Sequence, residues 1–333
     1  TLSLRDSLPI WVSEFVQSAL DGYNVCLVSY GQTGSGKTHT MQGSGDGPMR
    51  GIIPRAIAQV GEYREKLEAQ GWNYTMDVTF VEIYNEQIRD LLRGCELGGG
   101  ADGADKAEAG GGRASGASAS SKGGADKAEK AGAEAEPKLE LKQEDGRVVV
   151  ANATHVPVDP RDTAEIDAIM AAAARQRSVG RTDMNARSSR SHAVFTLHLR
   201  ATNPGHRAQL LGTLSLVALA GSERLARSGA GSDAARLKET QAINKSLSCL
   251  TDVFTAIAAK QSHIPFRNSK LTHLLQPALS GDGKTLMMVN LSPTESSYGE
   301  SLCALRFAQA VNKCELGRPK RQLKDAPSGG AKK

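Results

Sequence analysis

A glycine-rich octapeptide, GQTGSGKT at Gly31–Thr38, follows the apolar run Val25–Tyr30. It matches every fixed position of G-x-x-x-x-G-K-[ST], a loop whose backbone N–H groups cradle nucleotide phosphates. Glycine permits that close approach, and the N-terminus of the following helix adds positive potential. Lys37 is predicted to neutralise the β- and γ-phosphates, and Thr38 to place its hydroxyl on Mg²⁺. The alternative interpretation is a glycine-rich turn without a ligand.

Two further polar stretches have the composition of segments that sense a γ-phosphate. NARSSRSH, Asn185–His192, is rich in hydroxyl groups and precedes a predicted strand. LAGSER places Gly221 directly after a buried strand, where its N–H can donate to a terminal phosphate. Nucleotide switches need segments that respond to the γ-phosphate. Taken alone, the first stretch is also consistent with a Ser/Arg loop, and the second with a strand-end turn.

One residue departs from what this chemistry favours. A P-loop site commonly has an Asp at the end of a neighbouring strand, where it helps to hold Mg²⁺. The predicted strand Leu211–Leu219 has Ala218 at that place. A methyl group cannot accept a hydrogen bond from Mg²⁺-bound water, so the sequence predicts weaker metal retention.

Alternating and helical hydrophobic patterns predict the elements that position these residues. Strands are expected at Val25–Tyr30, Tyr74–Ile83, Leu139–Gln143, Arg147–Ala151, His192–Arg200, Leu211–Leu219 and Thr285–Leu291. Helices are expected at Leu8–Leu20, Ile52–Ala69, Leu237–Ala259 and Gly299–Lys313, with a further helix starting at Asp159-Pro160. The mixture predicts an α/β three-layer domain of the P-loop NTPase type, with helices on both faces of a central, mostly parallel or mixed sheet.

Two segments lack core-forming residues. Residues 94–136 contain no aromatic or β-branched side chain, and GADKAE occurs twice within them. Such a segment cannot bury enough apolar surface to offset its ordering entropy, so we predict a disordered insert. The basic segment 317–333 is predicted to be a disordered tail.

Bulk properties exclude several classes of protein. The 333 residues, 39% hydrophobic, suffice for one large domain or two smaller ones. No apolar run approaches the roughly 20 residues that span a bilayer, and the N-terminus lacks a signal-peptide pattern. Five scattered cysteines without metal-binding spacing predict reduced thiols and an intracellular protein. The net charge of +5 weakly favours acidic partners, and we expect neither a nucleic-acid nor a membrane partner.

Six motifs occur in the order found in kinesin motor domains, which the chain therefore resembles. They are GQTGSGKTHTM, EIYNEQIRDLL, NARSSRSH, LAGSER, HIPFRNSKLTHLLQ and SLCALRFAQAVNKCELG. The resemblance runs from about Ile10 to Gly317 without the insert, and implies a motor domain over 1–316. The ending VNKCELGRPKR most resembles kinesins with a C-terminal motor, which usually move toward the microtubule minus end.

The resemblance assigns roles to individual residues. It implies that the nucleotide is held by Gly31, Gln32, Thr33, Gly34, Ser35, Gly36, Lys37, Thr38 and His39, with His39 against the adenine. It implies that Thr38 and Ser189 hold Mg²⁺, and that Asn185 and Ser188 place the γ-phosphate and water. Gly221 resembles the γ-phosphate sensor. Arg190 and Glu223 resemble an ion pair that closes the site, with Glu223 relaying a proton from the attacking water. Arg267 and Lys270 resemble part of the microtubule-facing surface, although charge alone is equally typical of solvated side chains.

The implied function is a microtubule-stimulated ATPase that uses ATP/ADP and Mg²⁺ and binds microtubules. A dimer through a stalk outside this chain is expected, in the cytoplasm on the microtubule cytoskeleton, including the spindle. Two departures from the family bear on this implied function. ALAGSE replaces DLAGSE. In addition, the residues present here begin after the family's first strand and its adenine contact. The alternatives are a nucleotide-dependent microtubule tether with little hydrolysis, and a P-loop enzyme with an unrelated acceptor such as a small-molecule kinase.

Overall fold

The computed structural model describes residues 10–45, 47–94, 138–144, 147–179, 189–223 and 234–325. Nearly all of the predicted insert therefore lies outside the described residues, as do Asn185 and Ser188. No described helix is both long enough and apolar enough to cross a bilayer.

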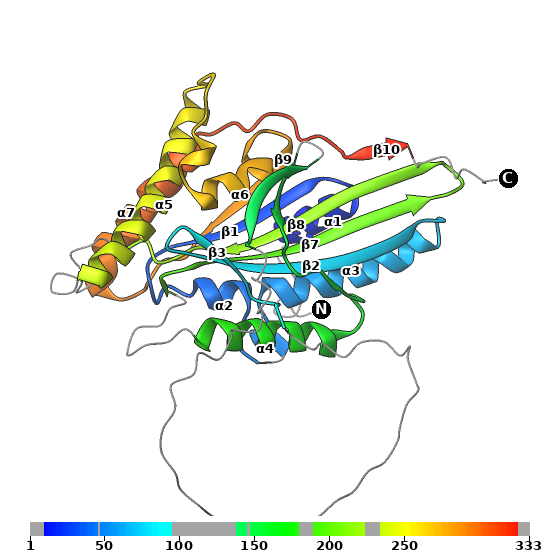
Figure 1. The fold of residues 1–333 in the computed structure, drawn as a ribbon, viewed down its shortest axis with the longest axis horizontal. Coiled ribbons are helices and arrows are strands. Elements are labelled where there is room, and N and C mark those ends of the chain that lie inside the picture. The colour runs from blue at the N-terminus through cyan, green and yellow to red at the C-terminus, as the bar shows by residue number, and fades with distance from the viewer. Residues whose placement is uncertain are drawn as a thin grey trace, which may run out of the picture.

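A mixed sheet forms the middle of the molecule (Figure 1). Its main path runs in the order β3-β2-β7-β8-β1-β9, while β6 pairs with β2 and β10 with β8. The strands are β1 (Asn24–Tyr30), β2 (Asn73–Tyr84), β3 (Gln87–Asp90), β6 (Val156–Pro157), β7 (His192–Asn203), β8 (Ala208–Ala218), β9 (Gly283–Val289) and β10 (Leu323–Asp325). Only β1 is parallel to its neighbours, β8 and β9, and the other pairings are antiparallel. β4 (Glu140–Glu144) and β5 (Arg147–Ala151) form a separate hairpin, as predicted.

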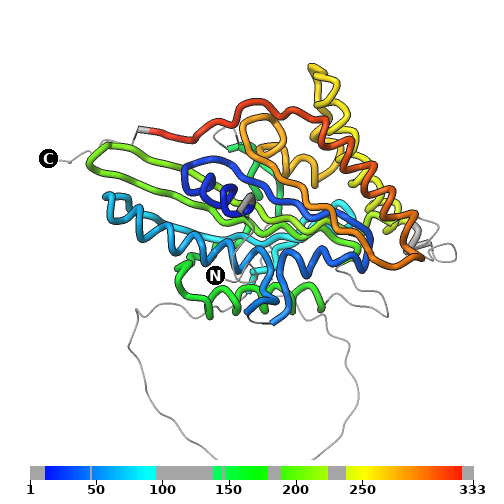
Figure 2. Tube along the Cα trace, turned by 180° about the vertical axis from the view of Figure 1, so that it is seen from behind, coloured from blue at the N-terminus to red at the C-terminus, as the bar shows by residue number. Residues whose placement is uncertain are grey.

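Helices cover both faces of the sheet, which confirms the predicted three layers (Figures 1 and 2). One face is packed by α1 (Ile10–Leu20), α2 (Lys37–Met41), α3 (Ile52–Glu68) and α4 (Thr163–Val179). The other is packed by α5 (Ala234–Ala258), α6 (Lys270–Leu279) and α7 (Tyr298–Asn312). The two apolar clusters follow from strand alternation, since Leu216 faces the α2–α3 side while Val217 faces α5 and α6.

The helix expected at Asp159 begins four residues later, at Thr163. The carboxylate of Asp162 accepts from the N–H of Glu165, which is the bond that caps a helix start. Asp159 instead accepts from Arg161, in a tight turn before the helix. The sequence offered two aspartates, and the structure uses the second as the cap.

Part of the predicted disordered tail is ordered. Leu323–Asp325 pair as β10 with Ala208–Leu210, a stretch of β8 that lies beyond the part paired with β1. The Arg321 guanidinium also donates to the carbonyl of Asp21 at 2.7 Å. The prediction of disorder is therefore wrong for this part, because β8 offers an edge that the tail backbone can pair with. Residues 326–333 lie outside the described residues.

Candidate functional site

The glycine-rich loop lies where parallel strands end together. β1 runs parallel to β8 and β9, and the loop begins directly after Tyr30, the last residue of β1. The N–H of Asn290, after β9, donates to the Tyr30 carbonyl, and the N–H of Ser222, after β8, donates to the Gly31 carbonyl at 3.1 Å. The carboxyl ends of three neighbouring strands thus meet at the loop, the usual place for a ligand in an open α/β sheet.

Glycine is required at the start of the loop. Gly31 has φ of 154°, and a Cβ there would overlap the carbonyl oxygen of Asn290. Gly36 has φ of 97° and precedes α2 in the left-handed region, which side chains rarely adopt. The loop therefore enters α2 with the N–H groups of its first turn lacking helical acceptors, an arrangement that suits phosphate oxygens.

Lys37 points back into its own loop. Its side-chain Nζ donates to the carbonyl oxygens of Gly31 and Gln32, both at 2.8 Å, and the residue is buried. Burial lowers the pKa of the Lys37 ammonium to about 8, although the nearby Glu223 carboxylate favours its charged form. Among the described residues, the hydrogen-bond partners of this buried cation are carbonyl oxygens, which an anionic phosphate can replace as a stronger partner.

Three buried polar atoms around the loop make no hydrogen bond within the described protein. They are the side-chain oxygens Gln32 Oε1, Ser35 Oγ and Asn290 Oδ1. Most buried polar groups in proteins are hydrogen-bonded, so a cluster of unpaired ones indicates a ligand position. Thr38 and His39 are exposed beside them. These residues fit a nucleotide with its Mg²⁺: N–H groups, Lys37 and the Ser35 hydroxyl for phosphate, and Thr38 for the metal.

The two predicted sensor segments are joined to the loop by hydrogen bonds. The N–H of Gly221 donates to the carbonyl of Ser189 at 2.7 Å. The Glu223 carboxylate accepts from the N–H of Thr33 at 2.8 Å and from its hydroxyl at 2.5 Å. A Cβ on Gly221 would overlap both the Glu223 carboxylate and the Thr33 hydroxyl, so a larger residue would displace these two side chains from each other. The structure thus brings Ser189, Gly221 and Glu223 to the loop.

The predicted ion pair between Arg190 and Glu223 is wrong for this structure. Arg190 instead pairs with Glu239 of α5 at 2.6 Å, and the same carboxylate accepts from the Tyr84 hydroxyl at 2.8 Å. Both charged side chains of the pair are largely shielded from water. Arg190 pairs with Glu239 because α5 places this carboxylate between Arg190 and the Tyr84 hydroxyl, whereas the Glu223 carboxylate already accepts from Thr33.

His192 is a site residue that the sequence reasoning did not single out. Its Nδ1 accepts from the N–H of Ala220, so Nε2 carries the proton and donates to Ser246 Oγ of α5 at 2.8 Å. Ser246 in turn donates to the carbonyl of Ile243. Burial lowers the pKa of His192 to about 3, so the ring stays neutral. A lone histidine at a strand start is most often a core residue, and nothing in its spacing reveals these partners.

Ala218 ends β8, where it pairs with Ser29 of β1 and Ala193 of β7. Its side chain belongs to the cluster that contains Met41 of α2, the helix that follows the loop. An acid at this position would therefore lie on the α2 side of the sheet, as expected for a residue that supports Mg²⁺. Ala218 brings no acceptor there.

Arg267 and Lys270 lie on the opposite helical layer. Both are exposed, Arg267 in the short helix Phe266–Asn268 and Lys270 at the first turn of α6. Ser269 caps α6, and Glu86 accepts from the Ser269 hydroxyl and the Lys270 N–H. Burial lowers the pKa of the neighbouring His273, and the charges of Arg267 and Lys270 lower it further.

Comparisons with curated proteins reveal close relatives. The chain is 49% identical to "Kinesin-like protein KIN-14N" of Oryza sativa subsp. japonica over 323 residues, covering 96% of this chain and 37% of the relative. It is 44% identical to human "Kinesin-like protein KIFC1", covering 92% of this chain and 41% of the relative. The chain therefore spans well under half the length of these curated relatives.

Solved structures give the same picture. The motor domain of the Saccharomyces cerevisiae kinesin-related protein KAR3 aligns with a TM-score of 0.67 at 41% identity, covering 91% of this chain and 78% of that one. A structure described as a fast kinesin aligns with a TM-score of 0.75 at 31% identity, covering 96% and 78%. The family model described as "Kinesin motor domain" matches residues 6–314, and the chain therefore belongs to the kinesin motor domain family.

Proposed function

We propose that this chain is a microtubule motor domain that binds and hydrolyses Mg-ATP. The observation that carries the proposal is the direct linkage of three segments at one end of the sheet. The loop at Gly31–Thr38 is hydrogen-bonded to Glu223, and Gly221 is hydrogen-bonded to Ser189. A group that contacts the phosphates can therefore act on both sensor segments.

Each residue of the site has a part in binding or positioning. Lys37 neutralises phosphate charge, the loop N–H groups bind phosphate oxygens, and His39 lies at the adenine. Thr38 and Ser189 hold Mg²⁺, which supplies charge neutralisation when bound. Gly221 donates to the γ-phosphate, and Asn185 and Ser188, outside the described residues, place phosphate and water.

Glu223 is proposed to accept a proton from the attacking water. In this structure Thr33 donates to both of its carboxylate oxygens, which holds the side chain at the loop. Its release from Thr33 would couple loop rearrangement to catalysis.

Microtubule binding is assigned to the exposed cations Arg267 and Lys270. They lie next to α5, the helix that contacts Arg190 and His192. A basic face there would meet an acidic partner surface, and its affinity would fall as salt screens the charges. A similar solved structure is described as a "C-terminal motor and motor homology domain of Kar3Vik1 fused to a synthetic heterodimeric coiled coil". We further propose a dimer through a stalk outside this chain, and a place on microtubules that includes the spindle.

A steady-state ATPase assay with and without microtubules tests the proposal. We expect turnover that microtubules stimulate and that Lys37→Ala removes, because the phosphates lose their buried cation. Lys138→Ala is the matched control, since the side chain of Lys138 is 86% exposed and far from the loop in sequence. Nucleotide binding without turnover would indicate a tether, and turnover that microtubules leave unchanged would indicate an unrelated acceptor.

A further inference from the structure

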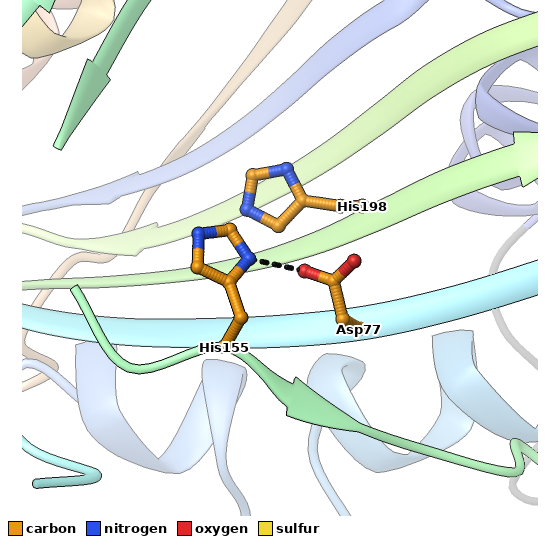
Figure 3. A group of neighbouring side chains, drawn as sticks. All are labelled: Asp77, His155 and His198. Carbon is orange, nitrogen blue, oxygen red and sulfur yellow. Dashed lines mark hydrogen bonds and ion pairs between the residues drawn. The ribbon is translucent and has the colours of Figure 1, made fainter. Parts of the chain in front are cut away.

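Asp77, His155 and His198 converge on the sheet face that α6 and the β4–β5 hairpin cover (Figure 3). Asp77 of β2 is the direct partner of His198 of β7, so the pleat turns both side chains to the same face. His155 immediately precedes β6, whose Pro157 pairs with Asp77. Strand pairing therefore fixes the positions of all three residues.

The three side chains offer a compact set of donor atoms. One carboxylate oxygen and one nitrogen from each imidazole lie within 4.8 Å of one another. His155 Nδ1 contacts Asp77 Oδ1 at 2.5 Å, and the two imidazole rings have centroids 5.1 Å apart. His198 Nε2 shares a hydrogen bond of 3.2 Å with the Thr79 hydroxyl. The contact between Asp77 and His155 is a simple aspartate–histidine pair. It does not explain why a second and largely buried histidine, His198, lies beside them.

A cavity of about 460 Å³ lies against this cluster. Both imidazoles line it, together with the hydroxyl-bearing residues Thr79 and Thr196. A cavity of this kind admits an ion and leaves room for a water ligand. It also gives the imidazoles space to turn, which a fully packed interior would deny them.

We infer that Asp77, His155 and His198 form a site for one zinc ion, with a water from the cavity as the fourth ligand. Two histidines and a carboxylate with an open fourth position are a ligand set that zinc uses in proteins. At Zn–N bonds of about 2.1 Å, tetrahedral ligands lie about 3.4 Å apart. The donor atoms lie within 4.8 Å of one another, so no pair has to close by more than about 1.4 Å. The ion would displace Asp77 from its contact with His155 and join β2, β7 and the segment before β6.

The donor atoms and the neighbouring charges together determine which cation the site favours. Asp77 supplies one negative charge, while Arg147, which lines the cavity, and Arg200 oppose a cation electrostatically. Imidazole donors favour zinc and other late transition metals over Mg²⁺ and Ca²⁺. The site is therefore independent of the Mg²⁺ expected at the nucleotide loop, which is built from hydroxyl oxygens.

Calorimetric titration of the nucleotide-free chain with Zn²⁺, in excess Mg²⁺, tests the inference. We expect one ion to bind the wild type and to raise its melting temperature, because the metal binds the folded state. His155→Gln should weaken binding at least about tenfold, since even residues that only support metal ligands are worth that much. His155 is exposed, so this variant retains the fold, and Asp77→Asn provides a second ligand variant of unchanged shape.

His206→Gln is the matched control, because His206 is exposed on the β7–β8 turn and should leave zinc affinity unchanged. Co²⁺ in place of Zn²⁺ should give a visible spectrum of nitrogen and oxygen ligands. Equal zinc affinity in the wild type and His155→Gln would overturn the assignment. So would a thiolate charge-transfer band with Co²⁺, which would locate the ion at cysteines, or a wild type that binds no zinc.

Discussion

Lys37 is a buried cation at the position where the nucleotide phosphates are expected to bind. Its ammonium donates to carbonyls of its own loop, and burial lowers its pKa from 10.5 to about 8. Because the folded pKa is depressed, the free energy of unfolding of the nucleotide-free protein should rise as the pH increases from about 8 toward 10.5. Below that window the charged ammonium opposes folding by a constant amount.

Nucleotide binding should therefore take up a proton in mildly alkaline solution. Phosphate favours the charged lysine, so binding at about pH 9 must protonate the fraction that is neutral in the free protein. The calorimetric enthalpy of ADP binding should then change with the ionisation enthalpy of the buffer, and the affinity should fall as the pH rises. At about pH 6.5 Lys37 is already charged, and its part of the buffer dependence should vanish. Identical enthalpies in two alkaline buffers would contradict this role.

Ala218 is the residue at which the chain departs from a standard Mg²⁺ site. It ends β8 on the side that faces α2, and it offers no acceptor for a metal-bound water. Ala218→Asp should raise microtubule-stimulated turnover and lower the Mg²⁺ concentration that turnover requires. The expected gain in metal affinity or in activity is about 10- to 100-fold.

Ala218→Asn is the matched control for this substitution, because it has the same shape without the charge. It should reproduce little of the gain. Melting temperatures of both variants must first show that the fold is retained, since position 218 is 7% exposed. Unchanged turnover and Mg²⁺ dependence in a folded Ala218→Asp protein would refute this account of the position.

At the residue scale, the sequence predicted the nucleotide loop because its geometry depends on local glycines and a local lysine. It did not predict the partner of Arg190. That partner, Glu239, lies 49 residues later and reaches the site only through the placement of α5. Contacts of this kind depend on tertiary packing, which no spacing along the chain encodes.

Among the elements, α5 is connected to the nucleotide side through His192 and Arg190. Ser246 of α5 accepts from His192 at the start of β7, and His192 accepts from the N–H of Ala220 after β8. One neutral imidazole thus joins three elements, two of which carry the sensor segments. A shift of Gly221 toward a phosphate would move the neighbouring Ala220 N–H, and with it the hydrogen bonds that His192 makes with Ala220 and Ser246.

His192→Gln tests the link between these elements. We expect a loss of stability of about 1–3 kcal/mol, because the Ala220 N–H and the Ser246 hydroxyl lose buried partners. Ser246→Ala removes only the α5 end, and the double variant should cost less than the sum of the two single changes. Chemical denaturation measures all three free energies of unfolding, and strictly additive costs would show that the two residues do not act together.

The predicted elements were mostly correct in type because their hydrophobic periods are strong. Errors occurred where two local signals compete or where a partner is distant. Asp159 and Asp162 both satisfy the preference for a helix cap, and only the folded turn selects Asp162. β10 has no hydrophobic pattern of its own and forms because β8 leaves an edge for it.

At the scale of the whole molecule, the insert is the longest stretch of the sequence without core-forming residues. Residues 95–137 lie between Gly94 and Lys138, whose carbonyl accepts from the Asn152 side chain. Replacing the insert, residues 94–136, with a short Gly/Ser linker should leave the melting temperature and the nucleotide affinity nearly unchanged, because the insert lacks core-forming residues. A fall of several degrees in a thermal scan would show that the insert packs on the domain.

The central claim is that the nucleotide at the loop controls binding on the α5–α6 side of the sheet. Microtubule co-sedimentation in ADP and in a non-hydrolysable ATP analogue tests it most directly, with wild type and the Arg267→Ala/Lys270→Ala double variant compared at two salt concentrations. The account predicts tighter binding with the analogue, weaker binding of the double variant in both nucleotides, and a smaller salt dependence for that variant. Equal affinity of the wild type in ADP and in the analogue would contradict the claim.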